Sequence, residues 1–415
     1  MTFINGVRTT RTLSESTTTS GVDFSVIGLI GTAPVQDVDE AKINEPVLIT
    51  TLDEGVEYFG TTKSGYTIPA ALEAVYSRLT SAKVIVVNVF DPDTHCSVTE
   101  DENGDTTTVY LPENVSTGDI IGGVNTDGSR YGLQAFKNAL TLCGYKPRIL
   151  IAPDYSKETA VQTALDTLAE TFRAHCYCDL DGSSVSEAIG NKSDATISEN
   201  IEYLYPYVQA YNSVTDEYEY RPASAYAAAT RVYTDSNSGM HYSLGNQVVK
   251  GITGIEDTIY FDIQDENSDS NLLNAQGITT IIYDEGYRFW GNRNSTYPDN
   301  EDVDSFSNVN RVANYIDESI AVKSRQFMSG PINTAMIDDV VNFGKNFLAN
   351  LKNKGWLIGY DCWYDPDKNT YDTLAAGKMV ISRKFLPPVP LEDLEYESEI
   401  DITLYSDIYE ESEDE

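Results

Sequence analysis

The sequence predicts a multidomain protein of mixed α/β (α+β) fold with extended arms at both ends. Buried-strand runs such as FSVIGLI (24–30), KVIVVNVF (83–90) and RILIAP (148–153) alternate with amphipathic helices, an order typical of parallel sheets. At 415 residues, with 41% apolar and 11% aromatic content, the chain is long enough for several packed cores. The two ends differ from this pattern: the N-terminal end is polar, and prolines separate the C-terminal end from the rest of the chain.

Residues 1–20 are crowded with Ser and Thr and contain Arg8 and Arg11 but only one acid, Glu15. Such a segment buries too little apolar surface to fold alone, so we expect a free-standing N-terminal arm. The first α/β segment, 21–90, starts with FSVIGLI and continues with the strand PVLITT (46–51) and a short helix ending near Gly60. A second helix follows, with Thr67 as the expected cap, and the segment ends with KVIVVNVF.

Residues 91–125 are polar, and VTEDENGDTTTVYL predicts two short strands around Asn103 and Gly104, that is, a small β insertion. An outer α/β domain is expected over 126–270. It contains a helix with one apolar face, the strand RILIAP, a helix from Ser156 and a helix around SAYAAATRVY (224–233). The apolar face of the first of these helices consists of Leu133, Phe136, Leu140 and Cys143.

A further α/β domain is expected over 271–386, with helices over about 308–326 and from Asn333 to Asn353. In the second helix the apolar residues share one face, which leaves Lys345 and Lys352 on an exposed row. Residues 320–354 contain five basic residues and two acids, the one clearly basic stretch of an acidic chain. An ordinary solvated helix face accounts for the two lysines as well as a contact surface does.

The last segment, 387–415, begins with Pro387, Pro388 and Pro390, which separate its predicted strand from the body. In it Ile400, Ile402 and Leu404 alternate with polar residues, the period of a half-buried strand. Such a strand pairs in its own domain or adds to the sheet edge of another subunit. From residue 391 to 415 there are twelve acids and no bases.

The overall charge restricts the class of partner. The chain has 65 Asp and Glu against 28 Lys and Arg, a formal net charge of -37. Binding to nucleic acid or to an anionic membrane surface is therefore disfavoured. Neither an export signal nor a membrane-spanning run is evident, so synthesis in a cytoplasm is expected, and five irregularly spaced cysteines fit a reducing compartment.

The candidate chemical motifs are weak. The HCYC run with His175, Cys176 and Cys178 supplies at most three zinc ligands, so ordinary packing is the better interpretation. GLIGTAP (28–34) lacks the third glycine and the Lys-Ser/Thr pair of a phosphate-binding turn. The acidic loops at 101–105 and 262–270 lack the glycine and distal glutamate of a calcium loop. We therefore expect no catalytic residue, no cofactor and no metal site.

One segment carries a specific resemblance. GYRFWGNRNS (286–295) resembles the G-Y-x-x-W-G-N-R-T signature of contractile phage tail sheath proteins, which are also found in phage-tail-like bacteriocins. Asn294 stands where the family usually has Thr. Segments resembling the family in the same order include NGVR (5–8), FSVIGLIGTAP (24–34), VLITTLDEGVEYFG (47–60), YSLGNQVVKGITGI (242–255) and FLPPVPLEDLEYE (385–397). The signature residues of this chain are Gly286, Tyr287, Trp290, Gly291, Asn292 and Arg293.

The resemblance implies that 271–386 is a conserved C-terminal sheath domain facing a tail tube, that the earlier domains lie outside it, and that both arms join the sheets of neighbouring subunits. It also implies a structural protein of a virion tail or phage-tail-like particle, assembled in the host cytoplasm as a helical homo-oligomer. The tube, the baseplate and the tail terminator are the implied partners. Contraction of the sheath would drive the tube through a target envelope.

Two residue-level hypotheses follow from the charges. Arg8 and Arg11 are expected near carboxylates of an adjacent subunit's acidic tail, and Lys345 and Lys352 are candidate tube contacts. The main rival function is an enzyme built on an α/β nucleotide-binding domain, and a secreted calcium-dependent adhesin is the third. An infectious phage, a defective prophage and a headless contractile bacteriocin fit the sequence equally.

Overall fold

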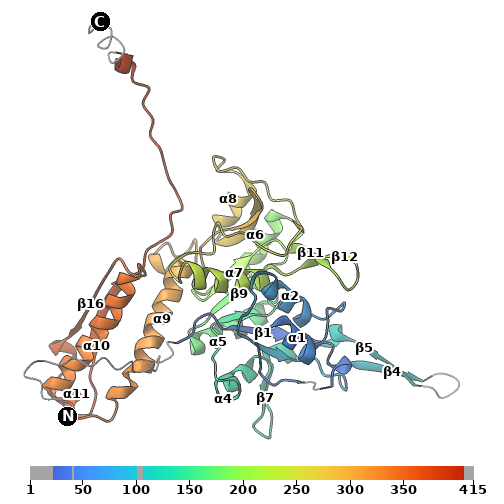
Figure 1. Cartoon of the computed structure of the whole chain (residues 1–415), viewed down its shortest axis with the longest axis horizontal. Helices are drawn as coiled ribbons and strands as arrows, with labels where there is room; N and C mark the ends of the chain where they lie inside the picture. The colour runs from blue at the N-terminus through green and yellow to red at the C-terminus, as the bar shows by residue number, and fades with distance from the viewer. Residues whose placement is uncertain (1–21, 40–41, 101–105, 406–415) are drawn as a thin grey trace, which may run out of the picture.

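The centre of the molecule is an eight-stranded sheet with the order β15-β14-β10-β9-β8-β1-β3-β2 (Figure 1). It is seen in a computed structural model that describes residues 22–39, 42–100 and 106–405. Neighbouring strands from β14 to β3 are parallel, whereas β15 and β2 close the two edges in antiparallel pairing. The strands are β1 (Ile27–Gly31), β2 (Val47–Ile49), β3 (Val84–Asn88), β8 (Ile149–Ile151), β9 (His175–Asp179), β10 (Ile201–Leu204), β14 (Ile278–Tyr283) and β15 (Tyr287–Trp290).

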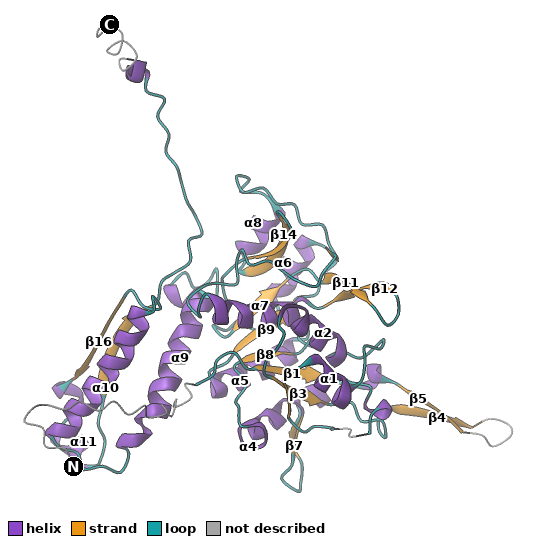
Figure 2. Ribbon diagram, in the orientation of Figure 1, coloured by secondary structure: helices purple, strands orange, loops and turns teal. Residues whose placement is uncertain are grey.

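The parallel strands form because they are apolar on both faces and helices cover both. Every residue of β1, β3, β8, β9 and β10 is buried. Helices α2 (Ile68–Arg78) and α7 (Ala223–Asn237) pack together, with α7 against β8 and β9, whereas α5 (Thr159–Phe172) packs on β9 from the other side (Figure 2). This arrangement is the usual one for a parallel sheet, in which the crossover helices supply the second layer.

Smaller elements surround this body. Two hairpins project from it, one formed by β4 and β5 and one by β11 and β12 (Figure 1). The remaining elements of the body are α1 (Leu52–Phe59), β4 (Cys96–Glu100), β5 (Thr106–Tyr110), α3 (Thr117–Ile121), β6 (Gly123–Val124), β7 (Arg130–Tyr131), α4 (Ala139–Cys143), α6 (Val185–Ser193), β11 (Val208–Asn212), β12 (Glu217–Arg221), β13 (Gly254–Ile255) and α8 (Asp269–Asn274).

Residues 306–386, which we call the C-terminal module, lie beside the body and pack around a second, smaller core, to which Phe24 and Met240 of the body also contribute (Figure 2). Their elements are α9 (Ser307–Lys323), α10 (Thr334–Asn353), β16 (Gly359–Tyr364), α11 (Tyr371–Ala375) and β17 (Ile381–Leu386). The core joins Val312 and Ile316 of α9 to Phe347, Leu348 and Leu351 of α10. The main sheet itself continues across the expected boundary at 270/271, since β14 and β15 are two of its strands.

Two local expectations differ from the structure. Thr67 occupies the N-cap position of α2 without capping it, because its Oγ1 accepts a hydrogen bond from Thr32 N at 3.1 Å. Leu133 and Phe136 are buried as predicted, but Leu140 is 60% exposed. The cause is a 3-10 turn over Gly132–Asn138, whose three residues per turn shift the phase of the helix that follows.

Other expectations are confirmed. The β insertion has its two strands, although Asn103 and Gly104 lie outside the described residues. The two long helices of the C-terminal third begin at Ser307 and Thr334, close to their predicted starts. Arg8 and Arg11 also lie outside the described part of the chain. No helix within the described ranges is long and apolar enough to cross a membrane.

Candidate assembly surfaces

The segment 286–293 builds the edge of the main sheet and turns the chain toward the C-terminal module. Gly286, with φ 115°, closes the β14–β15 hairpin, where its carbonyl accepts from Asp284 N at 3.0 Å. Trp290 packs edge-on against Phe261 with ring centroids 5.1 Å apart. Gly291 has φ 143°, and a Cβ at this position would lie 2.7 Å from Thr279 Cα. Both glycines are therefore required by the backbone.

Asn292 and Arg293 then fix the start of α9. The carbonyl of Asn292 accepts from Ser307 N at 3.1 Å, and Arg293 forms an isolated antiparallel bridge with Phe306. The Arg293 guanidinium lies over the Phe306 ring, 3.6 Å from its centroid, and bonds to the Glu392 carboxylate. Sequence reasoning missed Glu392, which is 99 residues away; the only signal was its position inside the matching segment FLPPVPLEDLEYE.

The C-terminal arm, residues 387–405, leaves the body as an extended trace (Figure 1). It exposes a series of apolar side chains, and Ile400 is 100% exposed. The predicted strand is not paired within the described residues, where Ile402–Tyr405 forms a 3-10 turn. The exposed apolar residues of the arm are Leu391, Leu394, Tyr396, Ile400, Ile402, Leu404 and Tyr405. A row of this kind is typical of a segment that binds a partner.

The β16–β17 hairpin of the C-terminal module offers a place for such a segment. The two strands pair from Gly359↔Leu386 to Tyr364↔Ile381, and one face packs on α10. No third strand pairs with either of them in the part of the chain that the structure describes. Both outer edges therefore carry unpaired backbone donors and acceptors, which are a template for strand addition.

An apolar groove of about 1040 Å³ adjoins this hairpin. Met336, Val340 and Phe343 of α10 form one wall, and Ile381 of β17 lies on another. The predicted inward face of α10 is thus split: Phe347, Leu348 and Leu351 are buried in the core, whereas Met336 and Val340 remain half-exposed in the groove. The sequence pattern did not separate the two halves, because both have the same period.

The charges on the groove and the arm are opposite. Lys378 and Arg383 line the groove, within a module that also contains the basic stretch 320–354. The arm from residue 391 onward has only acidic charges. Lys345 and Lys352 are both exposed on α10, and neither forms an ion pair with any described residue.

A buried charge cluster attaches α9 to the body. Asp235 of α7 lies between Arg231, whose Nη2 is 2.7 Å away, and Arg311 of α9 at 2.8 Å. Burial raises the pKa of Asp235, but the two guanidinium groups outweigh burial and hold this pKa below its ordinary value. Removing one partner would leave a buried charge uncompensated, so the cluster fixes α9 against α7.

A second group of ion pairs lies about two turns further along α9. Arg148 of the body donates to Glu318 at 2.6 Å, and Arg173 donates to Asp317 at 3.0 Å. Asp317 also pairs with Arg383 of β17. Burial raises the pKa of Glu318, but the cations Arg148, Lys146 and Arg173 lower it by more. The pKa of Glu318 is therefore below its ordinary value. Charge pairs along one side of α9 thus join the body to the module, beside the apolar packing of Phe24 and Met240 in the module's core.

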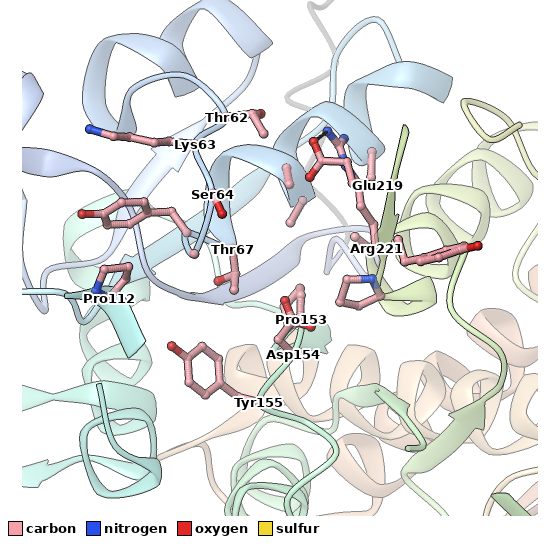
Figure 3. Close-up of a pocket in the computed structure, with 18 of the residues that line it drawn as sticks. Thr62, Lys63, Ser64, Thr67, Pro112, Pro153, Asp154, Tyr155, Glu219 and Arg221 are labelled. Atoms are coloured by element: carbon pink, nitrogen blue, oxygen red, sulfur yellow. Dashed lines mark hydrogen bonds and ion pairs between the residues drawn. The ribbon is translucent and has the colours of Figure 1, made fainter. Parts of the chain in front are cut away.

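A polar cavity of about 680 Å³ lies near the carboxyl ends of β1 and β8 (Figure 3). This is where a doubly wound enzyme binds its ligand, because the strand order reverses there. Two of the three cations that line the cavity are paired, Arg221 with Glu73 at 2.9 Å and Lys63 with Asp37 at 3.2 Å, whereas Lys157 forms no ion pair with a described residue. Arg221 and Lys63 are therefore not free to bind an anionic ligand.

The turn after β1 is also unsuited to phosphate. Thr32 N donates to Thr67 Oγ1, and Ala33 N donates to Asn88 Oδ1 at 2.9 Å. A phosphate cradle needs such backbone N–H groups to point at the ligand. Here they are used within the fold, which agrees with the missing glycine and lysine of GLIGTAP.

The HCYC run is divided by the alternation of strand β9. His175 faces Glu202, with Nε2 3.4 Å from Oε2, whereas Cys176 and Cys178 lie on the other face near Asp166. Burial lowers the pKa of His175 and raises the pKa of both thiols. The three side chains therefore do not converge, as expected for ordinary packing.

Comparison with known proteins gives consistent matches along most of the chain. Residues 128–295 match the family model described as the phage tail sheath protein central domain, and residues 300–401 match the phage tail sheath C-terminal domain. The tail sheath protein of Burkholderia phage BcepMu is 33% identical, over 96% of this chain and 97% of its own length. That of Escherichia phage P2 is 31% identical over 90% of each chain.

A prophage protein and solved structures give the same result. A putative prophage major tail sheath protein of Pseudomonas aeruginosa is 32% identical, over 96% of this chain and 97% of its own. The contracted helical sheath of the anti-feeding prophage has a TM-score of 0.67 at 19% identity, covering 97% of this chain and 100% of that chain. The contracted sheath of the extracellular injection system PVC has a TM-score of 0.66 at 15% identity, covering 97% and 99%. The fold is thus similar to that of these sheath subunits.

Proposed function

Because this chain belongs to the phage tail sheath family, we propose that its terminal arms bind the C-terminal modules of neighbouring subunits and link them into a helical sheath around a tail tube. The chain is a structural subunit of a contractile tail sheath and not an enzyme. The observation that carries the proposal is the contrast between an unpaired apolar arm and an unpaired β16–β17 hairpin on the same subunit.

The energetics favour an arm that orders only on a neighbour. Ordering a residue costs about 1–2 kcal/mol, whereas a new hydrogen bond returns about 0.5–1.5 kcal/mol. Strand pairing alone therefore does not order the arm. Burial of Ile400, Ile402 and Leu404, at about 1.5–3 kcal/mol each, supplies the difference.

The groove next to β17 suits the apolar side of the arm. An arm strand added at the hairpin edge presents alternate side chains toward α10, where Met336, Val340 and Phe343 are half-exposed. Lys378 of the groove, which forms no ion pair with a described residue, complements the acids that alternate with the apolar residues of the arm. This combination favours a second copy of this chain over an unrelated apolar partner.

The N-terminal arm is proposed to act in the same way on another neighbour. Arg8 and Arg11 would then lie near the acidic tail of an adjacent subunit, and lattice assembly would weaken with salt. Deletion of residues 1–18 should abolish regular polymers. Normal polymers from this truncated chain would contradict the role of the two arginines.

Lys345 and Lys352 are proposed to contact the tube. Exposed ion pairs contribute only about 0–1 kcal/mol each. Many such pairs together would hold an extended sheath on the tube, and each would break easily during contraction. We expect Lys345→Glu/Lys352→Glu to weaken assembly on isolated tubes, measured by co-sedimentation. Lys354→Glu, a change at an exposed residue beyond the helix end, is the matched control, and unchanged assembly of the double variant would mean that the face is only solvated.

On this proposal the sheath assembles in the host cytoplasm with the baseplate and the tail terminator, as part of a virion tail or a phage-tail-like particle. Subunits then rotate and slide during contraction while the arms keep them linked, and the tube is driven through the target envelope. The experiment that tests the arms directly is deletion of residues 393–415. Electron microscopy should reveal free subunits in place of cylinders, with an unchanged melting temperature; cylinders would contradict the proposal.

A further inference from the structure

Glu392 marks the point at which the C-terminal arm separates from the body. Arg293 Nε donates to Glu392 Oε1 at 2.8 Å, and Nη2 donates to Oε2 at 2.5 Å, so the pair is bidentate. Arg293 Nη1 donates to Ser305 Oγ at 2.5 Å. Its guanidinium lies 3.6 Å from the ring centroid of Phe306 and 4.5 Å from that of Tyr297. Ser305, Tyr297 and Phe306 therefore hold the Arg293 guanidinium, and its Nε and Nη2 atoms bind the arm.

The path of the arm before Glu392 is also fixed. Asn308, which is buried at the start of α9, donates from Nδ2 to the carbonyl of Pro388 at 3.3 Å. Pro387, Pro388 and Pro390 restrict the backbone between these contacts to extended conformations. From residue 393 to residue 402 no hydrogen bond or ion pair joins the arm to the body, and Leu394 and Tyr396 are exposed.

We propose that Arg293 is a positioning residue of sheath assembly, which clasps Glu392 and thereby aims the C-terminal arm at one neighbouring subunit. The proposal rests on the function proposed above and adds the residue pair that directs the arm. Figure 1 shows the arm leaving the junction of body and module in a single direction. A fixed exit narrows the volume that the arm searches and raises its effective concentration at the receiving hairpin.

The geometry explains why this residue is an arginine. A planar guanidinium stacks between aromatic rings and still presents two parallel donors to a carboxylate, whereas a lysine offers one point charge. The side chain of Arg293 is 13% exposed and that of Glu392 is 38% exposed. Because water reaches the Arg293–Glu392 pair, the pair contributes little to the free energy of unfolding. Its main effect is to fix the direction in which the arm leaves the body.

The test compares Glu392→Gln with Glu395→Gln in the full chain. Both substitutions remove one negative charge from an exposed arm residue, but Glu395 forms no contact with the body in the described part of the chain. A nitroxide carried on a non-natural amino acid at position 394 reports arm mobility in the monomer. Turbidity and electron microscopy report the polymerisation rate, and calorimetry reports the melting temperature.

We expect Glu392→Gln to mobilise the nitroxide and to slow polymerisation by about threefold or more, with no change in melting temperature. Glu395→Gln should match the unsubstituted chain, and Arg293→Lys should fall between the two. Equal nitroxide mobility in Glu392→Gln, Glu395→Gln and the unsubstituted chain would contradict the proposal that Arg293 positions the arm through Glu392. Failure of the unsubstituted chain to polymerise would contradict the proposed function instead. The nitroxide spectra would still show whether the pairing of Arg293 with Glu392 positions the arm.

Discussion

The main sheet and the C-terminal arm of this subunit differ in where their apolar residues find partners. The five central strands β1, β3, β8, β9 and β10 bury every residue within the chain. In β1, for example, Ile27 pairs with Val84 on one side and Ile149 on the other. The arm carries apolar residues at alternate positions, yet Ile400 is completely exposed. The central strands thus find their partners within the chain, whereas the arm finds none among the described residues, which is why we propose that another copy covers it.

The junction between the body and the C-terminal module contains a buried charge cluster, and the loss of this cluster should have the largest effect on the fold. Asp235→Asn would leave Arg231 and Arg311 buried without their counter-charge. We expect the free energy of unfolding to fall by about 3–5 kcal/mol, measured by urea denaturation. Asp338→Asn, at an exposed position of α10, is the control and should leave stability unchanged.

The same cluster predicts a pH dependence. The folded pKa of Asp235 is lowered, so its contribution is present above the unfolded pKa of about 3.9 and is lost as the pH falls through the folded value. Stability measured by calorimetry should therefore fall steeply below about pH 4, and less steeply in Asp235→Asn. Equal slopes for both chains would contradict this assignment.

A core substitution in the body should have a slightly smaller effect. Leu150 of β8 is fully buried, and Leu150→Ala removes its packing against neighbouring strands and helices. We expect a loss of about 2–5 kcal/mol in the free energy of unfolding by urea denaturation. A loss below about 1 kcal/mol would mean that the sheet core is less well packed than the burial of its strands indicates.

Asp179 should have a weaker effect on stability, and its pKa is shifted in the opposite direction to that of Asp235. Burial raises its pKa to about 6, although Ser224 Oγ and Ser156 Oγ donate to the carboxylate. Its contribution is favourable below the unfolded pKa and is lost as the pH rises through about 6. Asp179→Asn should raise the free energy of unfolding by about 1–2 kcal/mol at pH 8, and Asp181→Asn, an exposed neighbour, should not.

The smallest effect on the fold is expected in the arm. Ile400→Ser changes a fully exposed side chain, so the free energy of unfolding should move by less than about 0.5 kcal/mol. Polymerisation, followed by light scattering, should nevertheless be strongly reduced. Thr403→Ser, a change on the polar face of the predicted arm strand, serves as the control. Normal polymerisation of Ile400→Ser would remove the contrast between arm and body.

The body could be predicted from the sequence because its signals are local. The run VIVV at 84–87 is apolar at every position, which only a strand buried on both faces requires. The exposed Leu140 was predicted wrongly because a 3-10 turn cannot be distinguished from an α-helix by apolar spacing over so few residues. The split of α10 into a core half and a groove half depends on neighbouring elements, so its own pattern does not contain it.

The assembly surfaces could be predicted only in part. The alternation of Ile400, Ile402 and Leu404 predicted an apolar segment but not what it contacts, because nothing among the described residues covers these three side chains. The pairing of Arg293 with Glu392 joins residues far apart in sequence, and no local pattern reports it. The Asp235 cluster is similar, since α7 and α9 meet only in the folded protein.

The most direct test of the account is negative-stain electron microscopy of the purified full-length subunit at high concentration without a tube, beside the chain lacking residues 393–415. We expect hollow, striated cylinders from the full chain and isolated subunits of equal melting temperature from the truncated one. Cylinders from both chains, or isolated subunits from both, would contradict the claim that the C-terminal arm links the subunits.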